Sequence, residues 1–198
     1  MLEEVLAGCV RVLGWDHPDT LASRNNLAVA YRDAGRLGEA VPLLEKTLAE
    51  QERVLGRDHP STLVSRGNLA AAYWGAGRLG EAVALLEEVL ADRVRVLGPD
   101  HPETLISRGN LALAYRNAGR LGEAIPLLEE TLADRVRVLG RDHPDTLTIG
   151  NNLASAYRAL RRGGGKRWSR VCRVLAWGWA RVAPRFGGAI RGGRGEGR

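Results

Sequence analysis

The sequence predicts an all-α solenoid of antiparallel helix pairs, and three observations predict it. A block of 42 residues recurs almost unchanged between His17 and Asp142. Each block holds two stretches with the apolar spacing of amphipathic helices, separated by glycine and proline. Aromatic residues make up only 5 %, so the core must consist mainly of Leu, Ala and Val, and Leu and Ala are strong helix formers. Stacked copies of such a block bury a continuous core that a single block could not form.

The first helix of each block begins at a His-Pro pair. In the first full block we expect it from about Pro18 to Ala34, because proline is accepted in the first turn of a helix. Gly35 can adopt the left-handed conformation that ends it. Leu27, Ala28 and Tyr31 fall on one face of this helix, and we expect that face in the core.

The second helix of the block is expected from about Gly38 to Leu55. Gly56 ends it, and a short loop through Asp58 leads to Pro60, where the next block begins. Its predicted buried stripe is Ala40, Leu43, Leu44, Thr47 and Leu48.

The 42-residue register also divides the whole chain. A lone second helix is expected at Leu2 to Leu13 and a lone first helix at Pro144 to Leu160, which makes eight helices in total. The predicted parts are a half repeat at 1–16, full repeats at 17–58, 59–100 and 101–142, a half repeat at 143–160, and a basic Gly/Arg/Trp-rich tail at 161–198. We expect the tail to be poorly ordered.

The charge is divided unevenly between the repeats and the tail. The net charge of the chain is +6, and residues 161–198 hold eleven Lys or Arg and one acid, a local +10. Subtracting +10 from +6 leaves −4 for residues 1–160. The two cysteines, Cys9 and Cys172, form no disulfide framework, which favours a reducing, cytoplasmic location. No apolar run approaches the roughly 18 residues of a membrane-spanning helix, and the N-terminus does not resemble a secretory signal.

Three interpretations of the tail remain open. The stretch from Trp168 to Val182 could lie on an anionic membrane, or the arginines could bind nucleic acid through its phosphates. We favour a third, in which the tail is a frameshift product. The repeat predicts Gly-Glu-Ala-Val within one residue of the place where the chain has Gly165 to Trp168. One set of codons for Gly-Glu-Ala-Val, followed by another G and read one base late, encodes Gly-Lys-Arg-Trp. The coding DNA would decide.

The repeated residues resemble the tetratricopeptide repeat, in the 42-residue form of kinesin light chains and many bacterial repeat proteins. The resemblance covers about residues 1–160 and departs at Arg24, Arg66 and Arg108, where the family has a large apolar residue. We expect each arginine to lay its stem along the core and send its head to solvent. The matching residues are Leu27, Ala28, Tyr31, Gly35, Ala40 and Leu44, the Asn25 to Ala28 string, and the Leu-Gly-x-Asp-His-Pro loop.

This resemblance implies a right-handed superhelix whose first helices line a concave groove and whose second helices form the convex back. Such grooves bind peptides or short helices, so we expect a protein-interaction scaffold. The alternative is a detached or truncated regulatory repeat region of a larger nucleotide-binding signalling protein. No G-x-x-x-x-G-K-[ST] phosphate loop occurs in this sequence. Self-association through the unpaired helices at both ends is a further possibility.

The side chains expected in the groove fall into three sets. An asparagine ladder could pair with the backbone of an extended peptide or could bond neighbouring helices and set their pitch, and the two interpretations are about equal. A second row consists of arginines interrupted by one tryptophan. It could attract acidic ligands and offer the tryptophan as an anchor, or it could be a solvated charged face. The sets are the ladder Asn26, Asn68, Asn110 and Asn152, with Asn25 on the same side; the row Arg32, Trp74, Arg116 and Arg158; and the apolar Val64, Ile106 and Leu113.

The repeated Asp-His pairs suggest acid–base chemistry but are better explained as helix caps. Each pair stands before a proline at the start of a first helix, where a polar cap is favoured. The sequence therefore predicts no catalytic residue, no metal site, no cofactor and no enzymatic activity.

Overall fold

The computed structural model describes residues 1–162, and within this part of the chain it has eight α-helices and no strand. Residues 163–198, which carry most of the predicted tail and its three interpretations, lie outside the described residues. The first compact unit is Met1–Ala156, and the second begins at Tyr157, inside the last helix. The helices are α1 (Leu2–Leu13), α2 (Pro18–Asp33), α3 (Leu37–Leu55), α4 (Pro60–Gly75), α5 (Leu79–Leu97), α6 (Pro102–Asn117), α7 (Leu121–Leu139) and α8 (Pro144–Arg162).

The histidines cap the first helices, as the sequence predicts. His59 has an extended backbone, and its Nδ1 atom accepts a hydrogen bond from the backbone N–H of Ser61 at 3.2 Å. Pro60 then occupies the first turn, where its missing N–H leaves no bond unmade. The same cap forms at His17, His101 and His143.

Glycines end both kinds of helix. After α2, Gly35 has φ 75°, and the N–H of Arg36 donates to the carbonyl of Tyr31 at 2.8 Å. This left-handed turn satisfies carbonyls that the helix leaves unpaired. After α3, Gly56 has φ 89° and ψ 161°, a conformation that is essentially restricted to glycine.

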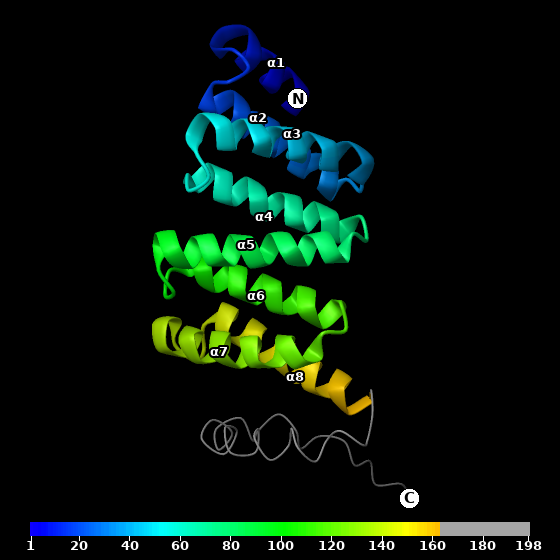
Figure 1. Cartoon of the computed structure of the whole chain (residues 1–198), viewed down its shortest axis with the longest axis vertical. Coiled ribbons are helices and arrows are strands. Elements are labelled where there is room, and N and C mark those ends of the chain that lie inside the picture. Colours follow the sequence, from blue (N-terminus) through cyan, green and yellow to red (C-terminus); the bar gives the residue numbers. More distant parts are fainter. Residues whose placement is uncertain (163–198) are drawn as a thin grey trace, which may run out of the picture. The chain divides into compact units, whose positions relative to one another are not determined.

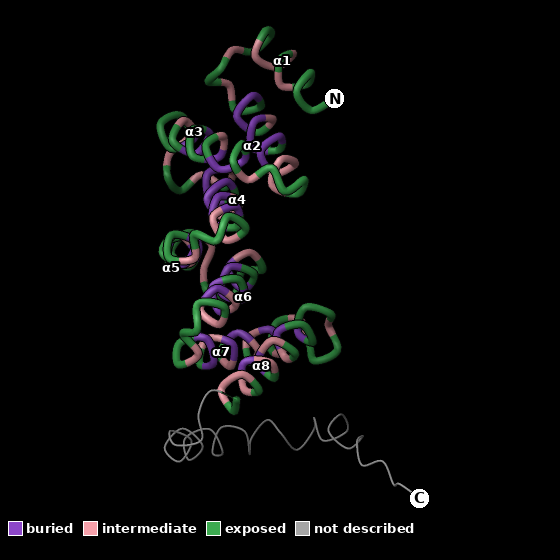
Figure 2. Tube along the Cα trace, turned by 90° about the vertical axis from the view of Figure 1, so that its right-hand side faces the viewer, coloured by how far each residue is buried: buried purple, intermediate pink, exposed green. Residues whose placement is uncertain are grey.

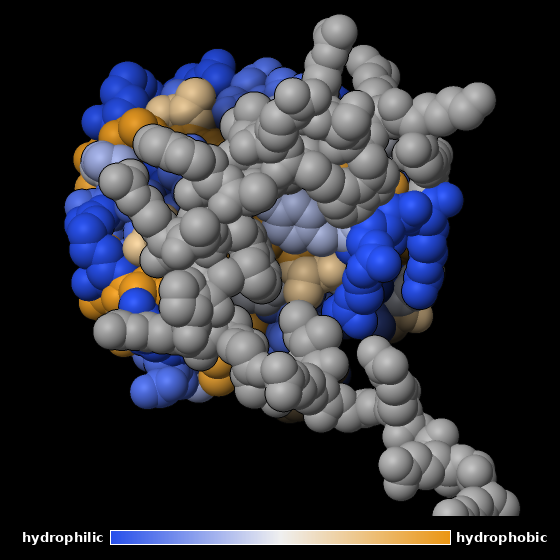
Figure 3. Space-filling model, turned by 90° about the horizontal axis from the view of Figure 1, so that it is seen from below, coloured by the Kyte–Doolittle hydropathy of each residue, from blue (hydrophilic) through white to orange (hydrophobic). Residues whose placement is uncertain are grey.

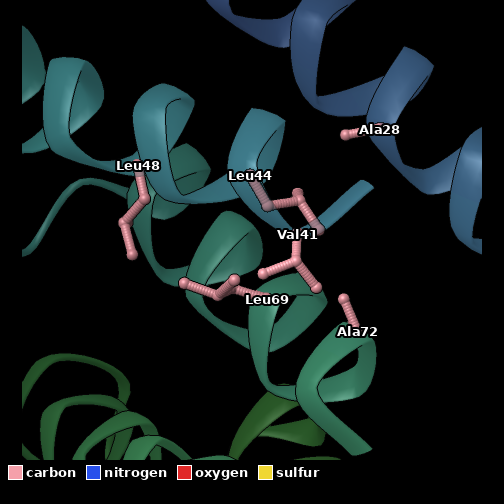
Figure 4. Packing of buried hydrophobic residues seen from close by; sticks show 6 residues of the cluster. All are labelled: Ala28, Val41, Leu44, Leu48, Leu69 and Ala72. Carbon is pink, nitrogen blue, oxygen red and sulfur yellow. The ribbon is translucent and has the colours of Figure 1, made fainter. Parts of the chain in front are cut away.

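The helix pairs share their core with the next pair. Ala28 of α2, Leu44 of α3 and Leu69 of α4 belong to one buried cluster, with Val41, Leu48 and Ala72 around them (Figure 4). Figure 1 shows the helices stacked in chain order, and in Figure 2 α3 and α5 lie on one side of the stack and α2, α4 and α6 on the other. The first helices therefore present a continuous face of their own.

A polar link at the edge of each repeat adds to this packing. The Tyr73 hydroxyl donates to Glu45 of the preceding second helix at 2.8 Å, and the Arg78 guanidinium lies 4.1 Å from the Tyr73 ring centroid. Arg78 also pairs with Glu81 at 2.5 Å. Tyrosine thus joins a second helix to the first helix that follows it. The equivalent tyrosine bonds are Tyr31–Glu3 and Tyr115–Glu87.

The prediction that Arg24, Arg66 and Arg108 send their heads to solvent is wrong. All three side chains are buried, heads included. Each pairs with an acid 26 residues later, on the second helix of the same repeat; the pairs are Arg24–Glu50, Arg66–Asp92 and Arg108–Asp134. A buried guanidinium is tolerated because a carboxylate compensates its charge and accepts its hydrogen bonds.

The surface of the described residues is mixed in character. Seen from below in Figure 3, hydrophilic side chains alternate with smaller apolar areas around the rim of the view. Among helices α1 to α8, none is both long and apolar enough to span a membrane.

Candidate peptide-binding face

A hollow opens between α4 and α6 on the face formed by the first helices. Its volume is about 330 Å³. Trp74 and Leu113 contribute apolar surface, Asn110 a carboxamide, and Leu86 of α5 lies at the base. The full lining is Gly67, Ala70, Ala71, Trp74, Leu86, Asn110 and Leu113.

Small side chains on α4 make room for this hollow. Gly67 and Ala71 occupy the places that Asn25 and Val29 hold one repeat earlier. Ala70 adds only a methyl group, whereas Trp74 in the next turn supplies a large wall. The hollow therefore belongs to the second full repeat, where three small residues and one large aromatic coincide. The sequence did not single out Gly67, Ala70 and Leu86 as residues of the site. The available signal for this hollow was Gly67, which has no side chain at the place where the first full repeat has Asn25.

The asparagine ladder is not uniform in the structure. Asn26 and Asn110 are exposed, whereas Asn68 and Asn152 are half-buried. The Asn68 side chain donates to Asn25 Oδ1 on α2 at 3.3 Å. At Asn68, then, the structure contains the bond between neighbouring helices that one of the two interpretations expects, while Asn110 borders the hollow with its amide accessible.

Asn25 was expected on the groove side, and that prediction is wrong. Its side chain is buried between α2 and α4. Oδ1 of Asn25 accepts a hydrogen bond from the Ser65 hydroxyl at 3.0 Å, in addition to the bond from Asn68. Two donors from the next repeat compensate for the burial of this amide.

The row that contains Trp74 carries less free charge than its composition suggests. Arg32 donates from both Nε and Nη2 to the carboxylate of its neighbour Asp33, at 3.0 and 2.8 Å. Arg116 donates to Asn117, which is neutral, so this contact leaves the arginine's positive charge uncompensated. Arg158 is exposed on α8, beyond the end of the first compact unit. Within this row, the positive charge on α4 and α6 comes from Arg116, because α4 has Trp74 at the same place.

Apolar side chains continue the face beyond the hollow. Val64 on α4 and Ile106 on α6 hold equivalent places in their repeats, and both are exposed. Leu113 is half-buried and reaches the hollow from α6. These exposed β-branched residues at equivalent places on α4 and α6 add apolar surface to the face of the first helices.

A second hollow of about 390 Å³ lies at α1 and α2. Trp15 and Leu27 line it together with residues of α1, and the sequence analysis did not predict it. The signal for it was Trp15, which stands where the later repeats have Arg57, Pro99 and Arg141. The Arg24 guanidinium lies over the Trp15 ring, 5.8 Å from its centroid.

The titratable groups of these helices take part in hydrogen bonds that hold the fold together. Burial and the hydrogen bond to Glu87 raise the pKa of Tyr115 to about 12, so its hydroxyl remains a neutral donor at physiological pH. Each histidine caps its own helix. Within residues 1–162, no three His, Cys, Asp or Glu side chains gather closely enough to hold a metal ion.

Comparison with known proteins decides the family. Two family models, both described as tetratricopeptide repeat, match residues 1–49 and 25–93 in one case and 104–145 in the other. The chain belongs to the tetratricopeptide repeat family. This confirms the predicted family and the predicted all-α solenoid of helix pairs. The family is one of repeat scaffolds, and its fold supports a general role in protein–protein interaction.

Solved tetratricopeptide-like structures are similar over most of the chain. A kinesin light chain protein from Podosopora anserina with nearly identical TPR-like repeats is 36 % identical, with a TM-score of 0.72 over 96 % of this chain and 86 % of that one. A point variant of that protein is 37 % identical, with a TM-score of 0.73 over 92 % and 85 %. BtubC (BKLC) from P. vanneervenii shares the fold at 21 % identity, with a TM-score of 0.72 over 100 % and 76 %. None of the curated proteins compared with the chain matches it.

Proposed function

We propose that the chain is a non-catalytic scaffold that binds a peptide segment of a partner protein along the face of α2, α4 and α6. The observation that carries this proposal is the hollow between α4 and α6, where Trp74, Leu113 and Asn110 converge. An apolar cavity with one or two polar groups at its rim is the usual form of a specific binding site. The proposal includes a reducing, cytoplasmic location.

The chemistry of the face suggests how such a segment would be held. An apolar side chain of the ligand would enter the hollow against the Trp74 ring, because buried tryptophan contacts contribute most to many interfaces. The accessible amide of Asn110 would bond the ligand backbone, since a carboxamide both donates and accepts. The positive charge of Arg116 would favour a ligand that has an acidic residue about one helical turn from the side chain that enters the hollow.

A pull-down from cell lysate with the full 198-residue chain tests this function. The wild-type chain would be compared with a Trp74→Ala/Asn110→Ala variant and with Val96→Ser, which changes an exposed apolar residue on α5. We expect a defined set of proteins to bind the wild type and the α5 variant and to be lost from the groove variant. Circular dichroism would establish that all three chains are folded.

Retention of the same proteins by the groove variant would contradict the proposal, because binding would then lie elsewhere on the chain. Asn68 is left unchanged in this test, since its bond to Asn25 also serves packing.

A further inference from the structure

The three junctions between successive first helices differ in the side chain that fills the space between them. At the α2–α4 junction this side chain is Asn25, which is only 7 % exposed. Oδ1 of Asn25 accepts hydrogen bonds from Ser65 and Asn68 on α4, at 3.0 and 3.3 Å. A polar side chain of the array itself, satisfied by two donors, therefore closes this junction.

At the α6–α8 junction an aliphatic side chain fills the equivalent space. Gly109 holds the place of Asn25, and Ile149 on α8 holds the place of Ser65. A Cβ atom placed on Gly109 would lie 3.0 Å from Cδ1 of Ile149, so the isoleucine packs directly on the glycine backbone. Both residues are buried. The side chain that Gly109 lacks is thus replaced by one from the neighbouring helix.

The sequence places neither of these side chains at the α4–α6 junction. Gly67 holds the place of Asn25, and the short Ser107 holds the place of Ile149. The Ser107 oxygen accepts a hydrogen bond from Arg93 Nη1 at 2.6 Å. A Cβ atom placed on Gly67 would meet no atom of another helix within 4 Å among residues 1–162, and Gly67 lines the hollow of the proposed peptide-binding face. The hollow is therefore the place where the array lacks a side chain that both neighbouring junctions contain.

The space over Gly67 reaches the core. Leu86 lies at the base of the hollow and is 6 % exposed, whereas its equivalents Leu44 and Leu128 are 0 % exposed. We propose that an aliphatic side chain of the bound peptide, of the size of isoleucine or leucine, fills this space as Ile149 fills the equivalent space at the α6–α8 junction. The inference rests on the proposed peptide-binding function and names the residue that the peptide must carry. Gly67 is then the residue that sets the specificity of the hollow.

The lining of the hollow selects an aliphatic side chain over a polar one. Ala70, Leu86 and Leu113 carry no hydrogen-bonding group on their side chains. A polar or charged group buried among them would lose its bonds to water without replacement, and a tyrosine or tryptophan would bring such a group with its ring. Asn110, the carboxamide of the lining, is exposed and is the group that bonds the peptide backbone in the proposed function.

Peptides enriched from a displayed random library on the full 198-residue chain test this requirement. We expect the enriched peptides to share one position that holds isoleucine or leucine. One such peptide, labelled with a fluorophore, would be titrated with the protein and followed by fluorescence anisotropy. Alanine at the shared position should weaken binding about tenfold or more, because it removes most of the apolar surface that the hollow buries. An aromatic or polar residue at the shared position would overturn the inference.

Gly67→Asn tests the site itself, because it gives α4 the residue that α2 has at the same place. Gly67 has no positive φ and open space beside it, so the variant should fold, and circular dichroism checks this. We expect the new side chain to weaken binding of the labelled peptide about tenfold or more. Gly67→Ala adds only a methyl group and should weaken binding less. Gly80→Asn, at an exposed helical glycine of α5, is the matched control and should bind as the wild type does.

Combining the two changes separates this inference from the proposed function. With Gly67→Asn, alanine in the peptide should cause little further loss, since both changes remove the same contact. Full additivity would place the aliphatic side chain elsewhere and overturn the inference. Wild-type affinity of Gly67→Asn, together with weaker binding by Trp74→Ala, would overturn the inference alone. If neither variant weakens binding, or no peptide is enriched, the proposed function fails and the inference fails with it.

Discussion

Arg66 on α4 donates a hydrogen bond from Nη1 to Asp92 Oδ2 on α5 at 2.5 Å, and both side chains are buried. The same carboxylate also accepts from Arg57 and Arg95. A pair of this kind joins the first helix to the second in each full repeat, so the core of this array is partly ionic. An ionic core tolerates the loss of both partners far better than the loss of one.

The Arg24–Glu50 pair allows the cleanest test of this relationship. Within residues 1–162, Glu50 has no other ion pair, whereas Asp92 has three arginine partners. Glu50→Leu should lower the free energy of unfolding by about 2 kcal/mol, below the ~3–5 kcal/mol of a fully buried pair, because water reaches part of Glu50. Arg24→Met combined with Glu50→Leu should recover most of that loss. Urea unfolding of the two single variants and the double variant measures the coupling.

Additive effects of the two changes would show that the contact contributes nothing specific. A double variant less stable than either single variant would contradict the explanation that the cost is that of an unpaired buried arginine.

Asp92 should make the stability of the array depend on pH in the acid range. Burial alone would raise the pKa of Asp92, but hydrogen bonds from Arg57, Arg95 and Arg66 outweigh burial and hold the pKa below its ordinary value of 3.8. A carboxyl whose pKa is lowered by folding stabilises the fold above its ordinary pKa, and that contribution is lost as pH falls through the folded pKa. We therefore expect constant stability from neutral pH down to about pH 5 and a steep decline below about pH 4.

Unfolding midpoints in urea at several pH values measure this dependence. Asp92→Asn should be less stable at pH 7 and should show a shallower decline in acid. Some slope should remain, because arginine partners also lower the pKa values of Asp58 and Asp100. A variant with the wild-type slope would contradict the role given to Asp92.

The histidine caps at the starts of the first helices lead to a separate prediction about stability. His59→Ala removes the acceptor for the Ser61 N–H and should cost about 1 kcal/mol of stability. His59→Asn should restore most of it, because asparagine is among the best N-cap residues. Thermal or urea unfolding measures both. If His59→Asn is as unstable as His59→Ala, the histidine acts through something other than the cap.

The sequence was sufficient to predict those features of the structure that depend on residues close together along the chain. Proline after histidine, glycine after the last apolar residue and the 42-residue register predict the helix ends to within one or two residues. α2 ends at Asp33 rather than Ala34, and α8 continues to Arg162 rather than ending at Leu160. Caps and turns are local, so their residues are visible in a single repeat.

The sequence was insufficient to predict those features that depend on which side chains of different helices are in contact. The burial of Arg24, Arg66 and Arg108 requires an acid on the facing helix, and the packing shows that residues 26 positions apart meet. Their constant spacing from Glu50, Asp92 and Asp134 was a usable signal. The α4–α6 hollow depends on several small residues together, and no one of them predicts it alone.

The affinity of a selected peptide tests the central claim, that this scaffold binds through the face of its first helices. A peptide enriched from a displayed random library by the full chain, labelled with a fluorophore, would be titrated with wild type, Trp74→Ala and Val96→Ser by fluorescence anisotropy. Loss of a tryptophan anchor costs about 2 kcal/mol or more, so Trp74→Ala should weaken binding about 30-fold. Val96→Ser, on α5, should bind as the wild type does. Unchanged affinity for Trp74→Ala, or an equal loss for Val96→Ser, would contradict the account.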